Sequence, residues 1–191
     1  MSVPEQYDMT PDACTAQGND GFAGKMGWGR RPALLLVDVC KAYWSATSPL
    51  DTTSNPASAA APASIAKLVA AARQGKIRLF WTRVEYTKAD MADAGLFYAK
   101  VPLLKLFQTG SQTGLGDWLP GLEPAGDDVV ITKRYPSAFF ATNLASSLEL
   151  YNIDALVICG VSTSGCVRAT ALDAMCLGFR PMVGVARLGN P

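Results

Sequence analysis

The chain has 191 residues, enough for one domain with a sizeable core, and 49% of its residues are apolar. Its formal net charge is +1, without a run of basic residues, which argues against a general affinity for nucleic acid or other polyanions. No apolar stretch approaches the roughly 20 residues of a membrane-spanning helix, and the first residues lack the basic and apolar segments of a secretion signal. We therefore expect a cytoplasmic protein with neither a membrane nor a nucleic-acid partner.

Five apolar runs along the chain predict strands. They are of the kind that parallel sheets bury on both faces, and they cover residues 33–39, 77–84, 128–133, 155–161 and 181–186. Because helical patterns separate these runs, the sequence predicts a three-layer, Rossmann-like α/β fold. We expect a mostly parallel sheet of five to six strands with helices on both faces.

The helical patterns and the loops alternate with these strands. Helices are predicted at residues 64–74, 137–150 and, after a turn, 163–179. Ser64 is the expected N-cap of the first helix, and Gly75 is its expected stop. Residues 45–63 are expected to form a loop, and residues 85–127 a long functional loop with one short helix.

The absence of histidine restricts the chemistry. The chain has none, which excludes a Ser-His-Asp triad, a Cys-His pair and a histidine-ligated zinc site. The five cysteines are an odd set without CxxC spacing, so we expect reduced thiols, with no metal and no cofactor. Cys40, Cys159 and Cys176 are expected to be small buried apolar residues, and Cys14 a surface thiol.

Three chemically capable side chains fall at one edge of the predicted sheet. Asp38 ends the first strand, Lys133 ends the third, and Cys166 follows the fourth. In open parallel sheets, the active site lies beyond the carboxyl ends of the strands. The three side chains are therefore candidates for a catalytic cluster.

Cys166 is the candidate nucleophile. It lies in the first turn of a predicted helix, after the segment Ser-Thr-Ser-Gly, where the helix dipole is expected to lower the pKa of a thiol. Attack on an amide would give a thioester, and N–H groups of the turn would receive the oxyanion. Asp38 would take the thiol proton and later activate water, while Lys133 would orient the carboxylate. The ordinary alternatives are a buried structural cysteine, an aspartate that closes a loop and a solvated lysine.

Three segments carry a resemblance to a known family. They read RPALLLVDVCKAYW, ITKRYPSAFFATNL and VICGVSTSGCVRATALDAM, and between them TRVEYTKADMADAGLFY adds to the likeness. They resemble the isochorismatase-like family of cysteine hydrolases, most strongly its N-carbamoylsarcosine amidase branch, with maleamate amidohydrolases nearby. On this resemblance, residues 31–191 are a hydrolase domain that is short at its C-terminus. Residues 1–30, which are rich in Gly, Asp and Gln and show no steady periodicity, are expected to form an N-terminal arm.

The resemblance implies roles for particular residues. The family's Asp-Lys-Cys triad falls on Asp38, Lys133 and Cys166. A cis peptide bond is implied between Val161 and Ser162, aiming the N–H groups of Ser162 and Cys166 at the oxyanion. Related nicotinamidases hold zinc through histidines, which this chain lacks. Family members are commonly dimers or tetramers, so a homo-oligomer is expected.

The implied activity is hydrolysis of a small carboxylated amide or ureide, such as N-carbamoylsarcosine, with release of ammonia. A maleamate-type amidohydrolase is the alternative within the class, and a catalytically silent oligomer subunit is the alternative outside it. A thiol redox protein is a weaker hypothesis, because no resolving cysteine sits at a short spacing.

The substrate carboxylate lacks its usual partner in this sequence. The carbamoylsarcosine branch uses an arginine after the fifth strand, where ungapped counting places Pro191, and Arg187 is out of register. Arg83, Arg134 or a neighbouring chain are the candidate replacements, with surface ion pairs as the ordinary role of both arginines.

Four aromatic residues flank the triad motifs and are candidates for the wall of a small pocket, with core packing as the alternative for each: Tyr43, Trp44, Tyr135 and Phe139.

Overall fold

The computed structural model describes residues 26–184. Their centre is a sheet of five parallel strands in the order β3-β2-β1-β4-β5. The strands are β1 (Pro32–Val37), β2 (Arg78–Val84), β3 (Val129–Lys133), β4 (Ala155–Gly160) and β5 (Arg180–Val183). The predicted strands and the parallel three-layer fold are confirmed, while residues 185 and 186 of the predicted fifth strand lie outside the described residues.

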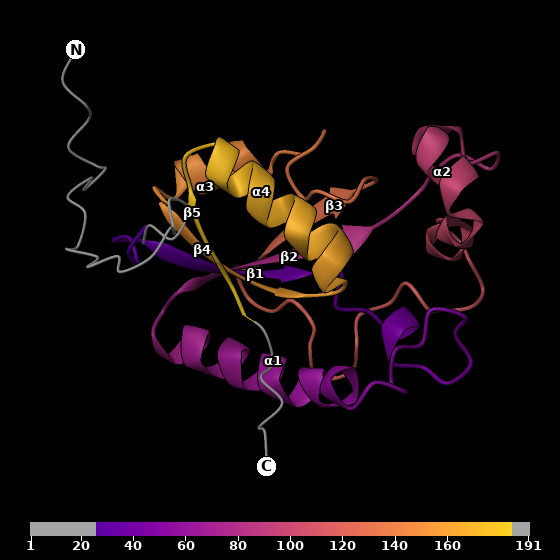
Figure 1. The fold of residues 1–191 in the computed structure, drawn as a ribbon, viewed down its shortest axis with the longest axis horizontal. Helices are drawn as coiled ribbons and strands as arrows, with labels where there is room; N and C mark the ends of the chain where they lie inside the picture. The colour runs from indigo at the N-terminus through magenta and orange to yellow at the C-terminus, as the bar shows by residue number, and fades with distance from the viewer. Residues whose placement is uncertain (1–25, 185–191) are drawn as a thin grey trace, which may run out of the picture.

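Helices cover both faces of the sheet. Figure 1 shows α1 (Pro56–Gln74) on one side, and α3 (Leu144–Leu150) and α4 (Arg168–Cys176) on the other. Side chains of β1 alternate between the two cores: Leu34 and Leu36 pack in the α1 layer, whereas Leu35 packs in the layer of α3 and α4. Since both faces are buried, β1 reads as a continuous apolar run.

The first helix begins eight residues earlier than the sequence predicts. Its N-cap is Asn55, whose Oδ1 accepts a hydrogen bond from the N–H of Ala57 at 2.9 Å, and Pro56 occupies the first turn. Ser64 is therefore interior to the helix and does not cap it. The Ala- and Pro-rich stretch indicated a loop, but proline is well suited to the first turn of a helix and alanine is the best helix former.

Pro62 lies inside α1 without breaking it. Proline lacks the N–H that would bond to the carbonyl of residue 58. The indole Nε1 of Trp44 donates to Ser58 O at 2.8 Å instead. A side chain from outside the helix thus satisfies the carbonyl that Pro62 leaves open.

The helix predicted at residues 137–150 is confirmed only from Leu144 onward. Ala141 has a φ of 55°, in the left-handed region, which a right-handed helix does not tolerate. Thr142 then accepts a hydrogen bond from the N–H of Leu144 at 3.2 Å through its Oγ1. Residues 137–143 form turns that lead the chain from the end of β3 into α3.

The long connection after β2 contains more structure than expected. It holds a 3₁₀ turn at Ala92–Ala94, α2 (Leu96–Lys100) and a 3₁₀ segment at Pro102–Phe107. A third apolar cluster, which includes Tyr86, Met91 and Phe107, packs this segment together. In Figure 1, α2 stands apart from the sheet, on the right of the view. Among the described helices, none combines the length and apolar character needed to cross a bilayer.

The predicted N-terminal arm falls mostly on residues 1–25, which lie outside the described residues, as do Cys14, Arg187 and Pro191. Cys40 and Cys159 are buried as predicted, but Cys176 is exposed. The last residue of α4 is turned away from the sheet, so the prediction of a buried Cys176 was wrong.

Candidate active site

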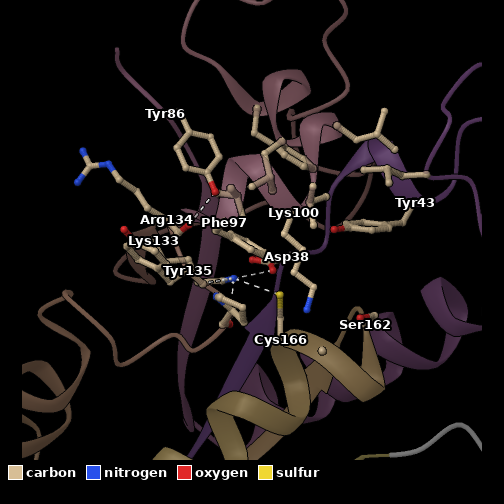
Figure 2. A pocket seen from close by; sticks show the side chains of 18 residues that line it. Asp38, Tyr43, Tyr86, Phe97, Lys100, Lys133, Arg134, Tyr135, Ser162 and Cys166 are labelled. Carbon is tan, nitrogen blue, oxygen red and sulfur yellow. Dashed lines mark hydrogen bonds and ion pairs between the residues drawn. The ribbon is translucent and has the colours of Figure 1, made fainter. Parts of the chain in front are cut away.

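The structure brings Asp38, Lys133 and Cys166 together at the carboxyl edge of the sheet. Asp38 follows β1, Lys133 is the last residue of β3, and Cys166 lies in a π-helical turn, Thr163–Val167, that precedes α4. The Nζ of Lys133 lies 2.8 Å from Asp38 Oδ2 and 3.4 Å from Cys166 Sγ (Figure 2). One ammonium group therefore contacts both the candidate base and the candidate nucleophile.

Lys133 is almost fully enclosed, with a side chain only 1% exposed. Its Nζ also donates to the carbonyls of Tyr135 at 3.1 Å and Pro136 at 3.2 Å, which fix its direction. Burial alone would lower the pKa of this lysine, but the adjacent Asp38 and Cys166 outweigh burial and raise it. Lys133 therefore stays charged and acts as a fixed positive group rather than as a base.

Asp38 is held by its own backbone and by Thr82. Its φ of 53° is left-handed, a conformation that non-glycine residues adopt mainly where surrounding contacts impose it. The N–H of Asp38 donates to Thr82 Oγ1 at 3.0 Å, and the Thr82 hydroxyl donates to Asp38 Oδ1 at 2.6 Å. Oδ2 forms the ion pair with Lys133 but accepts no hydrogen bond of good geometry from the described residues. This oxygen keeps a lone pair available for a proton.

The thiol of Cys166 is protonated at neutral pH. Burial raises its pKa to about 11, Asp38 adds to the rise, and Lys133 opposes it. The prediction that the helix start lowers this pKa was therefore wrong. A turn of N–H groups favours a thiolate, but here the desolvated setting and the neighbouring carboxylate count for more.

The end of β4 places the segment before Cys166 beside the end of β1. The Val161–Ser162 peptide bond is cis. The N–H of Val161 donates to Val37 O at 3.0 Å, one residue before Asp38. Gly160 has a φ of 125°, and a Cβ at this position would overlap the Val37 carbonyl, so only glycine permits this approach.

A pocket of about 290 Å³ opens onto the three side chains (Figure 2). Tyr43 and Tyr135, two of the predicted pocket residues, line it together with Ser162. The pKa of Tyr43 is raised, first by burial and then by Asp38, so its phenol is neutral. A volume at the small end of ligand pockets, with mostly apolar walls, suits a small substrate.

Three predicted pocket residues lie elsewhere. Trp44 packs toward α1 and lines a separate cavity on that side of the sheet. Arg83 pairs with Glu85 at 3.5 Å, away from the triad pocket. Phe139 is in the core, stacked on Phe179. For Trp44 and Phe139 the core-packing alternative holds, and for Arg83 the ion-pair alternative holds.

Several residues of the site were missed from the sequence. Thr82 follows Trp81, which pairs with Leu36, so the strand register places Thr82 beside the end of β1. A polar residue within the apolar β2 was the available signal. Phe97 and Lys100 reach the pocket from α2, within the long connection, where sequence pattern alone gives no spatial placement.

In the part of the chain that the structure describes, no group of three or more side chains is arranged to hold a metal ion. Asp38, Lys133 and Cys166 bring a carboxylate, an ammonium group and a thiol together in the pocket.

Comparison with known proteins agrees with this architecture. The fold and pocket place the chain among three-layer α/β proteins that carry a polar cluster at the carboxyl edge of a parallel sheet. Residues 32–185 match the isochorismatase domain, and the chain belongs to the isochorismatase family.

Two curated relatives and one solved structure illustrate the match. Maleamate amidohydrolase from Pseudomonas putida is 38% identical over 174 residues, covering 90% of this chain and 79% of that protein. N-carbamoylsarcosine amidase from an Arthrobacter species is 33% identical, covering 89% of this chain and 64% of that protein, which is just under two thirds of its length. A cysteine hydrolase from Pseudomonas syringae has the same fold, with a TM-score of 0.72 at 24% identity, over 80% of this chain and 70% of that one. The chain is thus an enzyme of the amidohydrolase class.

Proposed function

We propose that the chain hydrolyses a small carboxylated amide or ureide through a thioester on Cys166, releasing ammonia. The observation that carries the proposal is the position of Lys133 Nζ, which contacts the Asp38 carboxylate and the Cys166 sulfur at the floor of a small pocket. That arrangement supplies a nucleophile, a proton acceptor and a fixed charge between them.

The first half-reaction forms the thioester. Since the resting thiol is neutral, Cys166 gives its proton to Asp38 as the sulfur attacks the amide carbonyl. The N–H groups of Ser162 and Cys166 receive the developing oxyanion. Collapse breaks the C–N bond, and the proton held by Asp38 passes to the leaving nitrogen, so that ammonia departs. Lys133 stabilises the negative charge as it moves between carboxylate and sulfur.

The second half-reaction uses water. Asp38, again ionised, takes a proton from a water molecule that attacks the thioester carbonyl. The C–S bond breaks, the proton returns to the sulfur, and a carboxylic acid leaves. The enzyme recovers its neutral thiol and ionised carboxylate, so no further reactant is needed.

The substrate class follows from the pocket and from the relatives. Maleamate and N-carbamoylsarcosine each carry a carboxylate beside the amide that is cleaved. The higher identity to the maleamate amidohydrolase favours a maleamate-type amide over a ureide. We therefore propose a linear amide with one carboxylate, with maleamate itself as the first compound to test.

Ammonia release tests this proposal. Purified protein would be assayed with maleamate, N-carbamoylsarcosine and nicotinamide, together with Cys166→Ala and, as a matched thiol control, Cys176→Ala at an exposed position. We expect release from a carboxylated amide that is lost in Cys166→Ala and kept in Cys176→Ala. Folded wild-type protein that releases no ammonia from any of these would favour the silent-subunit alternative and overturn the proposal.

A further inference from the structure

The triad pocket holds more positive charge than the triad needs. Three basic side chains line it: Lys100, Lys133 and Arg134. Lys133 is neutralised by Asp38 at 2.8 Å, and Arg134 lies 3.3 Å from Asp93 through its Nε. In Figure 2 the Arg134 guanidinium points away from Cys166. Neither of these two groups offers an unopposed charge to a ligand beside the nucleophile.

Lys100 differs from both. It is the last residue of α2, and Figure 2 shows its ammonium extending toward Cys166 and Ser162. Within residues 26–184, no acidic side chain pairs with it. Its backbone is held in place, because the N–H of Val101 closes the helix on Phe97 O at 2.9 Å and the Phe97 ring stacks on Tyr135.

The charges in the pocket therefore sum to about one positive unit. The Cys166 thiol is neutral, since burial raises its pKa to about 11, and the charges of Asp38 and Lys133 cancel. Lys100 supplies the one positive charge that remains. A substrate with a single carboxylate complements this charge, whereas a neutral amide does not.

We propose that Lys100 binds the carboxylate of the substrate and so selects carboxylated amides over neutral ones. This inference rests on the proposed function. It assigns the binding of the substrate carboxylate, here called the clamp, to Lys100 of α2 rather than to Arg83 or Arg134. In this arrangement a substrate would present its amide carbon to Cys166 Sγ and its carboxylate to the Lys100 ammonium, since both side chains line the same pocket.

Turnover provides the first test. Lys100→Met keeps an unbranched side chain of nearly the same length and removes its charge, and Lys100→Arg keeps the charge. Lys105→Met, on the neighbouring 3₁₀ segment and outside the pocket, is the matched control.

We expect Lys100→Met to raise KM for maleamate roughly tenfold with little change in kcat, and Lys100→Arg and Lys105→Met to stay near wild type. Hydrolysis of the neutral methyl ester of maleamate, measured as ammonia release, should be unaffected. Equal losses on both compounds would overturn the inference.

Alkylation provides a test that needs no substrate. Iodoacetate and iodoacetamide modify the same sulfur and differ in that only iodoacetate carries a carboxylate. The ratio of their rates at Cys166, followed by mass spectrometry of the peptide that contains it, reports the local attraction for an anion. Lys100→Met should lower this ratio several-fold, while Lys105→Met should leave it unchanged. An unchanged ratio in Lys100→Met would mean that Lys100 is an ordinary solvated lysine, and it would overturn the inference.

The two tests separate failure of the inference from failure of the proposed function. If wild-type protein turns over carboxylated amides and Lys100→Met behaves like Lys105→Met in both tests, the clamp is wrong and the hydrolase stands. If no amide is turned over, the proposed function fails, and the alkylation ratio still decides whether Lys100 attracts an anion at the thiol.

Discussion

Thr82 fixes the direction of the Asp38 carboxylate. Its Oγ1 accepts a hydrogen bond from the backbone N–H of Asp38 and donates one to Oδ1, at 3.0 and 2.6 Å, and the whole residue is buried. With Oδ1 occupied in this way, Oδ2 is the oxygen directed to Lys133 and available to the thiol. In the proposed mechanism Thr82 is therefore a positioning residue, which acts through Asp38.

Replacing Thr82 with valine should reduce kcat with little change in KM. Valine keeps the shape of threonine but leaves a buried carboxylate oxygen without its donor, which costs about 1–3 kcal/mol in structures of this kind. We expect a tenfold or larger loss of kcat, measured by steady-state ammonia release. Thr82→Ser retains the hydroxyl and should recover most of the rate. A change confined to KM would argue against positioning.

The raised pKa of Cys166 predicts an unusual reactivity profile. Since the thiolate is the reactive form and the pKa is about 11, alkylation by iodoacetamide should still rise about tenfold per pH unit between pH 8 and 10. Asp38 raises this pKa, so Asp38→Asn should be alkylated faster at pH 8 while being inactive on amides. Site-resolved mass spectrometry measures the alkylation rate, and ammonia release measures the activity on amides. Thermal unfolding checks that the variant is folded. A rate that levels off below pH 9 would contradict the profile.

The position of the site could be predicted from the sequence, but its energetics could not. Asp38, Lys133 and Cys166 each follow or end an apolar run, and parallel strands bring such ends to one edge. The direction of the Cys166 pKa shift depends on burial and on the nearby carboxylate, which only the folded chain supplies. Lys100 was missed because it lies in a long connection whose path no sequence period reveals.

At the scale of elements, α1 depends on a contact from outside itself. Pro62 removes the N–H that would bond to Ser58 O, and the Trp44 indole donates to that carbonyl at 2.8 Å. A second contact ties the loop after β1 to the helix, because the hydroxyls of Thr52 and Ser58 lie 2.5 Å apart. The start of α1 and the segment after Asp38 therefore support one another.

A double-mutant cycle measures this support. Trp44→Phe should destabilise the fold by about 1 kcal/mol beyond its loss of apolar contact, because Ser58 O loses its donor. In a Pro62→Ala background, the alanine N–H replaces the indole, so the same substitution should cost correspondingly less. Urea unfolding of the four proteins gives the coupling free energy. A coupling of zero would mean that water satisfies the carbonyl equally well.

Strands were predictable where helix starts were not. The strands are apolar runs whose burial on both faces leaves a plain signal, and their number and order in the chain followed from it. The start of α1 lies in a stretch of serine, alanine and proline, which suits a loop as well as a first helical turn. The start of α3 depends on the left-handed backbone conformation of Ala141, which no residue pattern predicts.

On the scale of the whole molecule, buried thiols link stability to pH. Cys40 and Cys159 lie in different apolar clusters, and burial raises the pKa of each from 9.0 to about 12. Above pH 9 an unfolded chain loses these protons while the folded chain keeps them. The unfolded state then binds fewer protons, so the free energy of unfolding falls as pH rises through the window from about 9 to 12.

Each such thiol should lower the free energy of unfolding by up to about 1.4 kcal/mol per pH unit within that window. Urea unfolding under reducing conditions at pH 8, 9, 10 and 11 measures the slope. With Cys159→Ala, the free energy of unfolding should decline less steeply with pH than in wild type. The difference in slope should correspond to close to one proton, whatever the stability of the variant at pH 8. Cys176→Ala, where the side chain is exposed, is the matched control and should run parallel to wild type. Parallel curves for wild type and Cys159→Ala would mean that the sulfur ionises as readily in the folded core as in the unfolded chain, which is incompatible with its burial between the sheet and α1.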